Sequence, residues 1–184
     1  MLIQCATSCH AAQKAAEKTA QEVAAVDSFF ALSAKDIDGN DVSFETFRGQ
    51  VTVLTNVASY CGYTESHYRS LVELYAATAG KLVTILAFPC NQFGKQEPGT
   101  ADDIKQFAAS KGVQFKMMEK IDVNGPDAHL VYKYLKHQTK TNAIGWNFAT
   151  YFVVDPDGNV EAHNGVEPMD LLPLILEKAG SEEL

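Results

Sequence analysis

The chain has 184 residues, of which 46% are hydrophobic, and it carries a formal net charge of -8. This length and apolar content are enough for one hydrophobic core, and no apolar run approaches the roughly 20 residues that a membrane-spanning helix requires, so we expect a soluble single domain. The negative charge argues against a general nucleic-acid or anionic-membrane binder, because either function needs a concentrated basic face.

The N-terminal segment differs from the rest of the chain in being rich in alanine with interspersed charges. It predicts an added helix or a frayed tail, and we assign residues 1–28 to an extension and 29–184 to the folded domain. The segment lacks the apolar core of a secretory signal, and a remnant of an organelle transit peptide remains the alternative. Cys5 and Cys9, followed by His10, have no second half of a zinc site elsewhere, so we expect solvated tail cysteines.

From residue 29 onward, apolar periodicity and turn residues predict alternating strands and helices. In chain order, the pattern first indicates a hairpin of residues 30–34 and 41–44, a strand at 51–57, a helix around 68–75 and a strand at 82–88. Helices at 101–110 and 128–137 follow. The chain then forms a hairpin of 151–154 and 158–161 and a closing helix at 168–178. This order is typical of a thioredoxin-like α/β sandwich, with a central mixed sheet flanked by helices and an N-terminal hairpin.

Cys61 lies where the apolar strand at 51–57 gives way to the helix that follows it. Unpaired backbone N–H groups and the positive end of the helix dipole stabilise an anion at such a junction, which favours the reactive thiolate. The alternative is a buried structural cysteine, since free cysteine is among the most buried residue types.

The neighbours of Cys61 exclude two kinds of thiol chemistry. A dithiol oxidoreductase needs a second cysteine three residues further on, where this chain has Thr64. A peroxiredoxin would have threonine and proline ahead of its cysteine, where this chain has Ala58 and Ser59. Four cysteines are too few for a secreted disulfide framework, so we expect a reducing compartment, the cytoplasm, with a mitochondrion or plastid as the alternative.

Three sequence blocks resemble the signatures of the glutathione peroxidase family, and most of all its phospholipid hydroperoxide branch. They are NVASYCGYT at 56–64, FPCNQFGKQEPG at 88–99 and WNF at 146–148, in the family's order and with similar spacing. The resemblance extends from about residue 30 to residue 178. It implies a thioredoxin-like fold and a thiol-dependent peroxidase that reduces hydrogen peroxide and organic or lipid hydroperoxides, with no metal, flavin or nicotinamide cofactor.

The same resemblance implies a catalytic tetrad of Cys61, Gln96, Trp146 and Asn147. A thiolate attacks the distal peroxide oxygen, and the amide and indole donors hold the thiolate and stabilise the leaving alkoxide. Taken one at a time, each donor has a structural alternative: a solvated loop glutamine, a core tryptophan and a turn asparagine.

The sequence leaves the reductant open. Thioredoxin-dependent relatives carry a resolving cysteine where this chain has Ala109, so the resemblance implies glutathione as the reducing thiol. One alternative is a thioredoxin-dependent peroxidase that resolves through Cys90 or a tail cysteine, and another is a peroxide sensor that oxidises a partner protein. We further hypothesise that Cys61 replaces a natural selenocysteine.

Some residues depart from the family pattern, and these departures change which binding partners we expect. Tyr63, Gly145 and His163 occupy positions that are basic in the phospholipid branch, so we expect weaker affinity for anionic partners. The alternative is compensation by Lys95 and Lys140, which lie in or near the relevant loops, although a surface lysine is usually only a solvated charge. The segment from Lys136 to Trp146 lacks the insertion through which tetrameric relatives associate, which favours a monomer.

Overall fold

The structure is a computed structural model that describes residues 14 and 17–180. Its centre is a five-stranded sheet in the order β5-β4-β3-β6-β7, in which β3 runs parallel to β4 and antiparallel to β6. The strands are β3 (Val51–Val57), β4 (Val83–Pro89), β5 (Lys116–Met117), β6 (Thr150–Val154) and β7 (Val160–Asn164), and a separate hairpin joins β1 (Ser33–Lys35) to β2 (Asp41–Ser43). The helices are α2 (Thr64–Ala77), α3 (Ala101–Ser110), α4 (Leu130–Thr139) and α5 (Leu172–Lys178), with 3-10 turns at Phe29–Ala31, Phe44–Phe47 and Pro168–Leu171.

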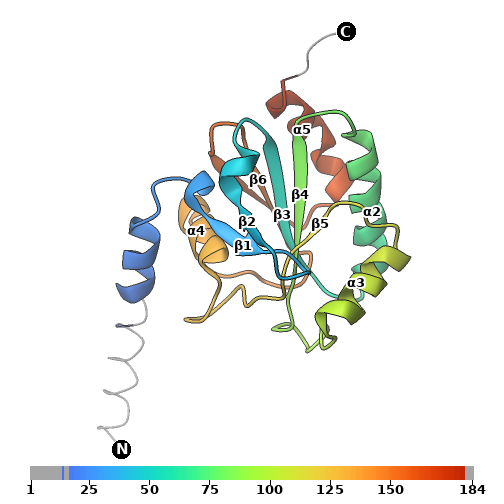
Figure 1. Ribbon diagram of the computed structural model, residues 1–184, viewed down its shortest axis with the longest axis horizontal. Helices are drawn as coiled ribbons and strands as arrows, with labels where there is room; N and C mark the ends of the chain where they lie inside the picture. The colour runs from blue at the N-terminus through green and yellow to red at the C-terminus, as the bar shows by residue number, and fades with distance from the viewer. Residues whose placement is uncertain (1–13, 15–16, 181–184) are drawn as a thin grey trace, which may run out of the picture.

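Two hydrophobic clusters pack on opposite faces of this sheet. Every residue of β3 is buried, and its side chains alternate between the faces. Val53 packs in the cluster that includes residues of α2, α3 and α5, whereas Leu54 packs in the cluster formed with α4 and the first hairpin. Figure 1 shows these helices on the two sides of the central strands. The predicted thioredoxin-like sandwich, with its mixed sheet and N-terminal hairpin, is therefore confirmed.

Several element boundaries differ from the prediction for local reasons. Residues 30 and 31 belong to a 3-10 turn rather than to β1. Helix α4 starts two residues later than predicted, because the His129 side chain caps it by accepting a hydrogen bond from the Val131 N–H. Strand β7 starts at Val160 because Gly158 adopts a φ of 95° inside the preceding turn. The closing helix begins as a 3-10 turn at Pro168, and the two-residue strand β5 was not predicted.

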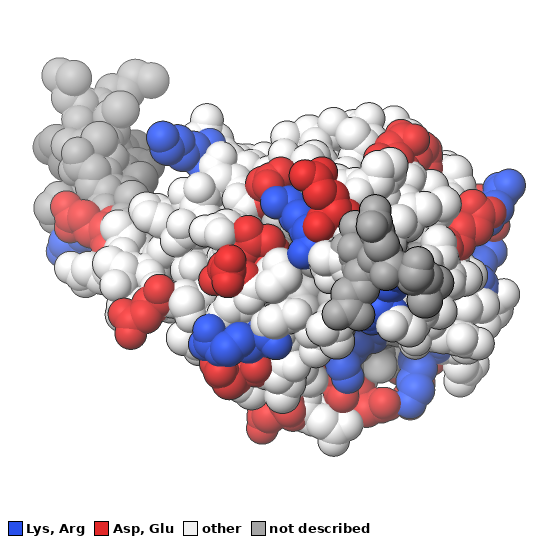
Figure 2. Space-filling model, turned by 90° about the horizontal axis from the view of Figure 1, so that it is seen from above, with Lys and Arg blue, Asp and Glu red and all other residues white. Residues whose placement is uncertain are grey.

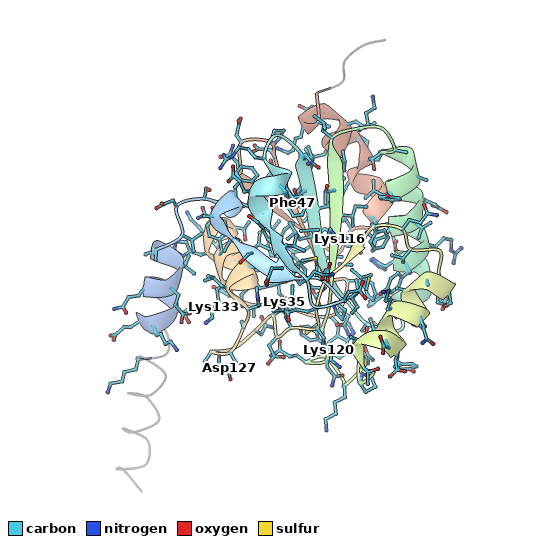
Figure 3. The ribbon with its side chains drawn as sticks, viewed as in Figure 1. Lys35, Phe47, Lys116, Lys120, Asp127 and Lys133 are labelled. Carbon is cyan, nitrogen blue, oxygen red and sulfur yellow. The ribbon has the colours of Figure 1, made fainter. Side chains whose placement is uncertain are left out.

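The described part of the N-terminal segment packs against α4. Residues 17–24 are helical, Val23 is buried in the cluster on the α4 side, and Lys133 Nζ lies 2.8 Å from Glu22 Oε2. Figure 3 shows Lys133 between this helix and α4. Cys5, Cys9 and His10 lie outside the described residues, and the boundary at residues 28 and 29 stays a prediction.

The surface carries both signs of charge. Figure 2 shows acidic and basic side chains interspersed on one face, and ion pairs such as Arg48 with Glu45 and Lys178 with Glu161 join them. Among the helices of the described residues, none is long and apolar enough to cross a bilayer.

Replacing Leu54 tests the placement of the core. Leu54 is fully buried in β3, so Leu54→Ala should lower the free energy of unfolding by about 2–5 kcal/mol through lost burial and a residual cavity. Leu82, which is 62% exposed just before β4, provides the matched control, and Leu82→Ala should change stability by less than about 0.5 kcal/mol. Urea unfolding followed by circular dichroism measures both, and equal effects would contradict the described packing.

Candidate active site

The Cys61 turn is held by a single threonine hydroxyl. Cys61 lies between the end of β3 and the start of α2 and is 8% exposed. Thr64 Oγ1 accepts a hydrogen bond from the Cys61 N–H (3.0 Å) and donates one to the Ala58 carbonyl (2.7 Å). The predicted position of Cys61 just before a helix is confirmed. Thr64, which sequence reasoning used only to exclude a dithiol motif, turns out to order the Cys61 backbone.

Gln96 lies in the loop after β4, and its backbone is hydrogen-bonded to the same turn. The Tyr60 N–H donates to the Gln96 carbonyl at 3.1 Å, one residue before Cys61. Gly94 and Lys95 adopt left-handed φ values of 60° and 53°, which turn the chain sharply just before Gln96. This backbone bond fixes the loop against the turn that carries the thiol.

Asn147 connects the third segment to the other two. Its side chain is fully buried, Asn147 Nδ2 donates to Gln96 Oε1 at 3.2 Å, and Asn147 Oδ1 accepts from Asn56 Nδ2 at 3.3 Å. Asn56 Nδ2 also lies 3.4 Å from the Trp146 carbonyl, and the Asn56 carbonyl accepts from the Phe148 N–H at 2.9 Å. We call the Asn56, Asn147 and Gln96 side chains the amide chain.

Sequence reasoning missed Asn56. The available signal was a lone amide in a strand whose residues are otherwise apolar or β-branched, since a buried polar side chain needs partners. Phe148 shows how firmly this segment is held, because it keeps a left-handed φ of 61° while its ring is buried. Such backbone geometry costs on the order of 1–3 kcal/mol and persists where surrounding contacts enforce it.

Three exposed aromatic side chains lie at or near the predicted site residues in the chain. Tyr60 is 69% exposed, Tyr63 is 56% exposed and Trp146 is 39% exposed. The Trp146 ring packs against Phe93 with 5.7 Å between ring centroids. We call Tyr60, Tyr63 and Trp146 the aromatic rim.

The structure thus brings the four predicted residues to one end of the sheet by different routes. Gln96 and Asn147 bond directly, Trp146 precedes Asn147, and Cys61 is linked to Gln96 through the Tyr60 backbone. Among the described residues, no side chain hydrogen-bonds to the Cys61 sulfur, and no group of three or more His, Cys, Asp or Glu side chains is placed to hold a metal ion. The arrangement offers amide and indole donors that are ordered by their own contacts.

The family model described as glutathione peroxidase matches residues 29–136, which is more than half of the chain. The chain belongs to the glutathione peroxidase family. It is 52% identical to the phospholipid hydroperoxide glutathione peroxidase of Macaca fuscata fuscata and 50% identical to that of Sus scrofa, in each case over 80% of this chain and 75% of the relative.

Solved structures agree with this assignment. The crystal structure of T. cruzi GPX1 superposes with a TM-score of 0.68 at 32% identity, covering 86% of this chain and all of the other. A thioredoxin-family thiol:disulfide interchange protein from Chlorobium tepidum, at 18% identity and a TM-score of 0.63, shares the fold. This glutathione peroxidase homologue is therefore an oxidoreductase that reduces hydroperoxides at the expense of a thiol, as its sequence predicted.

The second described cysteine lies in a different environment from Cys61. Cys90 is fully buried in the cluster on the α4 side of the sheet, whereas Cys61 belongs to the cluster on the α2 side. Burial raises the pKa of the Cys90 thiol above its ordinary value. Both features make Cys90 a poor nucleophile.

Glu97, next to Gln96, is a buried carboxyl that sequence reasoning did not single out. It is fully buried, and neither of its carboxyl oxygens makes a hydrogen bond within the described residues. Burial raises the pKa of Glu97, and this effect exceeds the opposing ones of nearby Ser59 and Lys120. Lys120, labelled in Figure 3, donates to the Glu97 carbonyl at 3.1 Å and so anchors the backbone of this loop.

Thr64 offers a test of the Cys61 turn with a matched pair of variants. Thr64→Val keeps the shape but leaves the Cys61 N–H and the Ala58 carbonyl unpaired, so it should cost about 1–3 kcal/mol of stability and slow the reaction of Cys61 with peroxide. Thr64→Ser keeps the hydroxyl and should stay close to wild type in both properties. Stopped-flow oxidation and urea unfolding measure the two effects, and indistinguishable variants would refute the role of the hydroxyl.

Glu97→Gln tests the buried carboxyl through the pH dependence of stability. A folded-state pKa above the unfolded value means that the folded protein binds the proton more tightly, so wild-type stability falls as pH rises from the ordinary carboxyl pKa through the raised one. The variant has no such titration. Its thermal midpoint relative to wild type should therefore increase between about pH 4 and about pH 8, by roughly 2–4 °C for each kcal/mol involved.

The control for this experiment is Glu73→Gln, the same substitution at an exposed site on α2. Its midpoint relative to wild type should stay nearly constant over the same pH range. A constant difference for Glu97→Gln as well would show that this carboxyl does not titrate abnormally.

Proposed function

We propose that Cys61 is the nucleophile of the peroxidase reaction. The Cys61 thiolate attacks the distal oxygen of the hydroperoxide, an S–O bond forms as the O–O bond breaks, and the alkoxide leaves and takes up a proton to become an alcohol. The sulfur is oxidised to a sulfenic acid and the peroxide is reduced. The observation that carries this proposal is a pair of hydrogen bonds, one from the backbone of the Cys61 turn to Gln96 and one between the Gln96 and Asn147 side chains.

Gln96, Trp146 and Asn147 are assigned as donors to the reacting atoms. Their N–H groups stabilise the thiolate before attack and the developing negative charge during it, and no metal, flavin or nicotinamide takes part in the proposed steps. Donors fixed in advance contribute more than donors that must reorganise during the reaction. The amide chain supplies this fixation, because Asn56 binds both Asn147 and the Trp146 carbonyl.

We propose that glutathione reduces the oxidised Cys61 in two steps. A first thiol attacks the sulfenic acid, forming a mixed disulfide and releasing water, and a second thiol attacks that disulfide, releasing glutathione disulfide and the Cys61 thiol. Cys90 lies across the sheet and is fully buried, which disfavours the alternative of a thioredoxin-dependent enzyme that resolves through it. Ala109 is exposed on α3 and supplies no thiol there.

Lipid hydroperoxides are proposed as substrates alongside hydrogen peroxide. The exposed Tyr60, Tyr63 and Trp146 form a rim with apolar rings and polar tips, which suits contact with an acyl chain at an interface. The relatives named above act on phospholipid hydroperoxides according to their names.

We further propose that the protein is a monomer and works in the reducing environment of the cytoplasm. The free thiols of Cys61 and Cys90 fit such an environment. The replacement of a natural selenocysteine by Cys61 remains a hypothesis, and a cysteine codon in the gene would end it.

Two cysteine variants test the chemistry. Cys61→Ser should abolish glutathione-dependent peroxide turnover while the fold stays intact, because a serine hydroxyl is a far weaker nucleophile at neutral pH. Cys90→Ala should retain turnover, since this thiol takes no part in the proposed cycle. A coupled assay of glutathione consumption measures both rates, and activity retained by Cys61→Ser would move the reaction to another thiol.

Mass spectrometry identifies the reductant. Protein treated with one equivalent of peroxide and then with one equivalent of glutathione should carry glutathione on Cys61. A disulfide that joins Cys61 to Cys90 or to a tail cysteine would instead favour thioredoxin-dependent turnover, and transfer of the oxidation to a partner protein would favour a sensor.

A further inference from the structure

We propose that the cavity beside Trp146 and Asn147 binds the positively charged ammonium group of the reducing thiol, with Glu167 as the residue that sets this specificity. The inference rests on the proposed function, because it concerns the second substrate of the same site. It assigns a charge preference to the thiol that attacks oxidised Cys61.

The cavity has a volume of about 440 Å³ and adjoins the proposed catalytic residues. Trp146 and Asn147 line it on one side, and Tyr63, two residues after Cys61, lines it on another. Glu167 lines it at the turn after β7. A group bound here therefore borders Trp146 and Asn147, two of the proposed catalytic residues.

The charge of the lining selects for a cation. None of the lining residues is Lys or Arg, and Glu167 is the one carboxylate among them, with its side chain 51% exposed. His67 Nε2 lies 3.5 Å from Glu167 Oε1, but burial lowers the pKa of His67 more than Glu167 raises it, so the imidazole adds no positive charge at neutral pH. His67 Nδ1 is 2.7 Å from the Tyr151 hydroxyl, which holds the ring in place.

The aromatic rings that line the cavity are a second reason to expect that it binds a cation. Tyr63 and Trp146 are both more than one third exposed and both line the cavity. The faces of such rings attract cations, most strongly when the cation is partly removed from water. A carboxylate and two accessible aromatic rings around one cavity form a suitable site for an alkylammonium group.

Glutathione offers this site a suitable group. Glutathione carries one ammonium and two carboxylates, and only the ammonium is attracted by Glu167. A fatty-acid hydroperoxide has no ammonium for Glu167 to recognise. The positions held by Tyr63, Gly145 and His163, which are basic in the resembling branch, offer no compensating lysine or arginine for a carboxylate.

A pair of small thiols of opposite charge provides the test. Cysteamine carries a positive charge and 3-mercaptopropionate a negative one, and the two are similar in size. The rate of peroxide turnover with each thiol is divided by the rate with neutral 2-mercaptoethanol. The ratio of the two normalised rates is the charge selectivity, and comparing this ratio between variants cancels the intrinsic reactivity of each thiol. Glu167→Gln should lower the selectivity for cysteamine by about 3–10-fold. Glu73→Gln, which makes the same change of net charge outside the cavity, should leave it unchanged.

The outcomes separate this inference from the proposed function. If wild type shows no peroxide turnover with glutathione or with any of the three small thiols, the proposed function fails. If wild type turns over 2-mercaptoethanol but Glu167→Gln has wild-type selectivity, the ammonium site is overturned. Tyr63→Leu is a second variant that removes only an aromatic face. It should lower the selectivity in the same direction, and an unchanged value for both variants contradicts the proposal.

Discussion

The site depends on a chain of hydrogen-bonded side-chain amides. Asn56 at the end of β3, Asn147 before β6 and Gln96 after β4 are far apart in the sequence, and two bonds of 3.3 Å and 3.2 Å join them in the structure. Buried amides are costly unless their partners are in place, so this chain has few alternative arrangements. The donors proposed to act on the sulfur lie in loops, and Asn147 is anchored to Asn56 of the central sheet by a hydrogen bond.

The sheet also explains why the two described cysteines lie in different environments. Cys61 lies in a turn held by Thr64 at the start of α2, while Cys90 continues from β4 into the core on the other face. The same β-sheet separates the two thiols, with Cys61 in the buried cluster on the α2 side and Cys90 in the one on the α4 side. Among the described residues Cys90 is therefore a poor partner for Cys61, and under the proposed cycle the reducing thiol comes from solution and meets the cavity lined by Glu167, Tyr63 and Trp146.

Local sequence signals predicted the elements that local contacts define. Helix α3 was predicted at 101–110 and spans Ala101–Ser110, because Thr100 and Asp103 cap it through reciprocal bonds between neighbours in the chain. Strand β5 was missed, since its two residues become a strand through pairing with β4, a contact distant in the sequence. The site shows the same division: sequence blocks pointed to Cys61 and its donors, whereas the contributions of Asn56 and Thr64 arise from hydrogen bonds that only the folded chain creates.

The central claim is that the amide chain prepares the donors that act on Cys61. Its most direct test is the second-order rate constant for oxidation of Cys61 by hydrogen peroxide in a single turnover without reducing thiol, compared between wild type and Asn147→Ala. Removing one preorganised donor of this kind should slow the reaction about 10²–10³-fold. A folded Asn147→Ala protein whose Cys61 reacts at the wild-type rate would contradict the account.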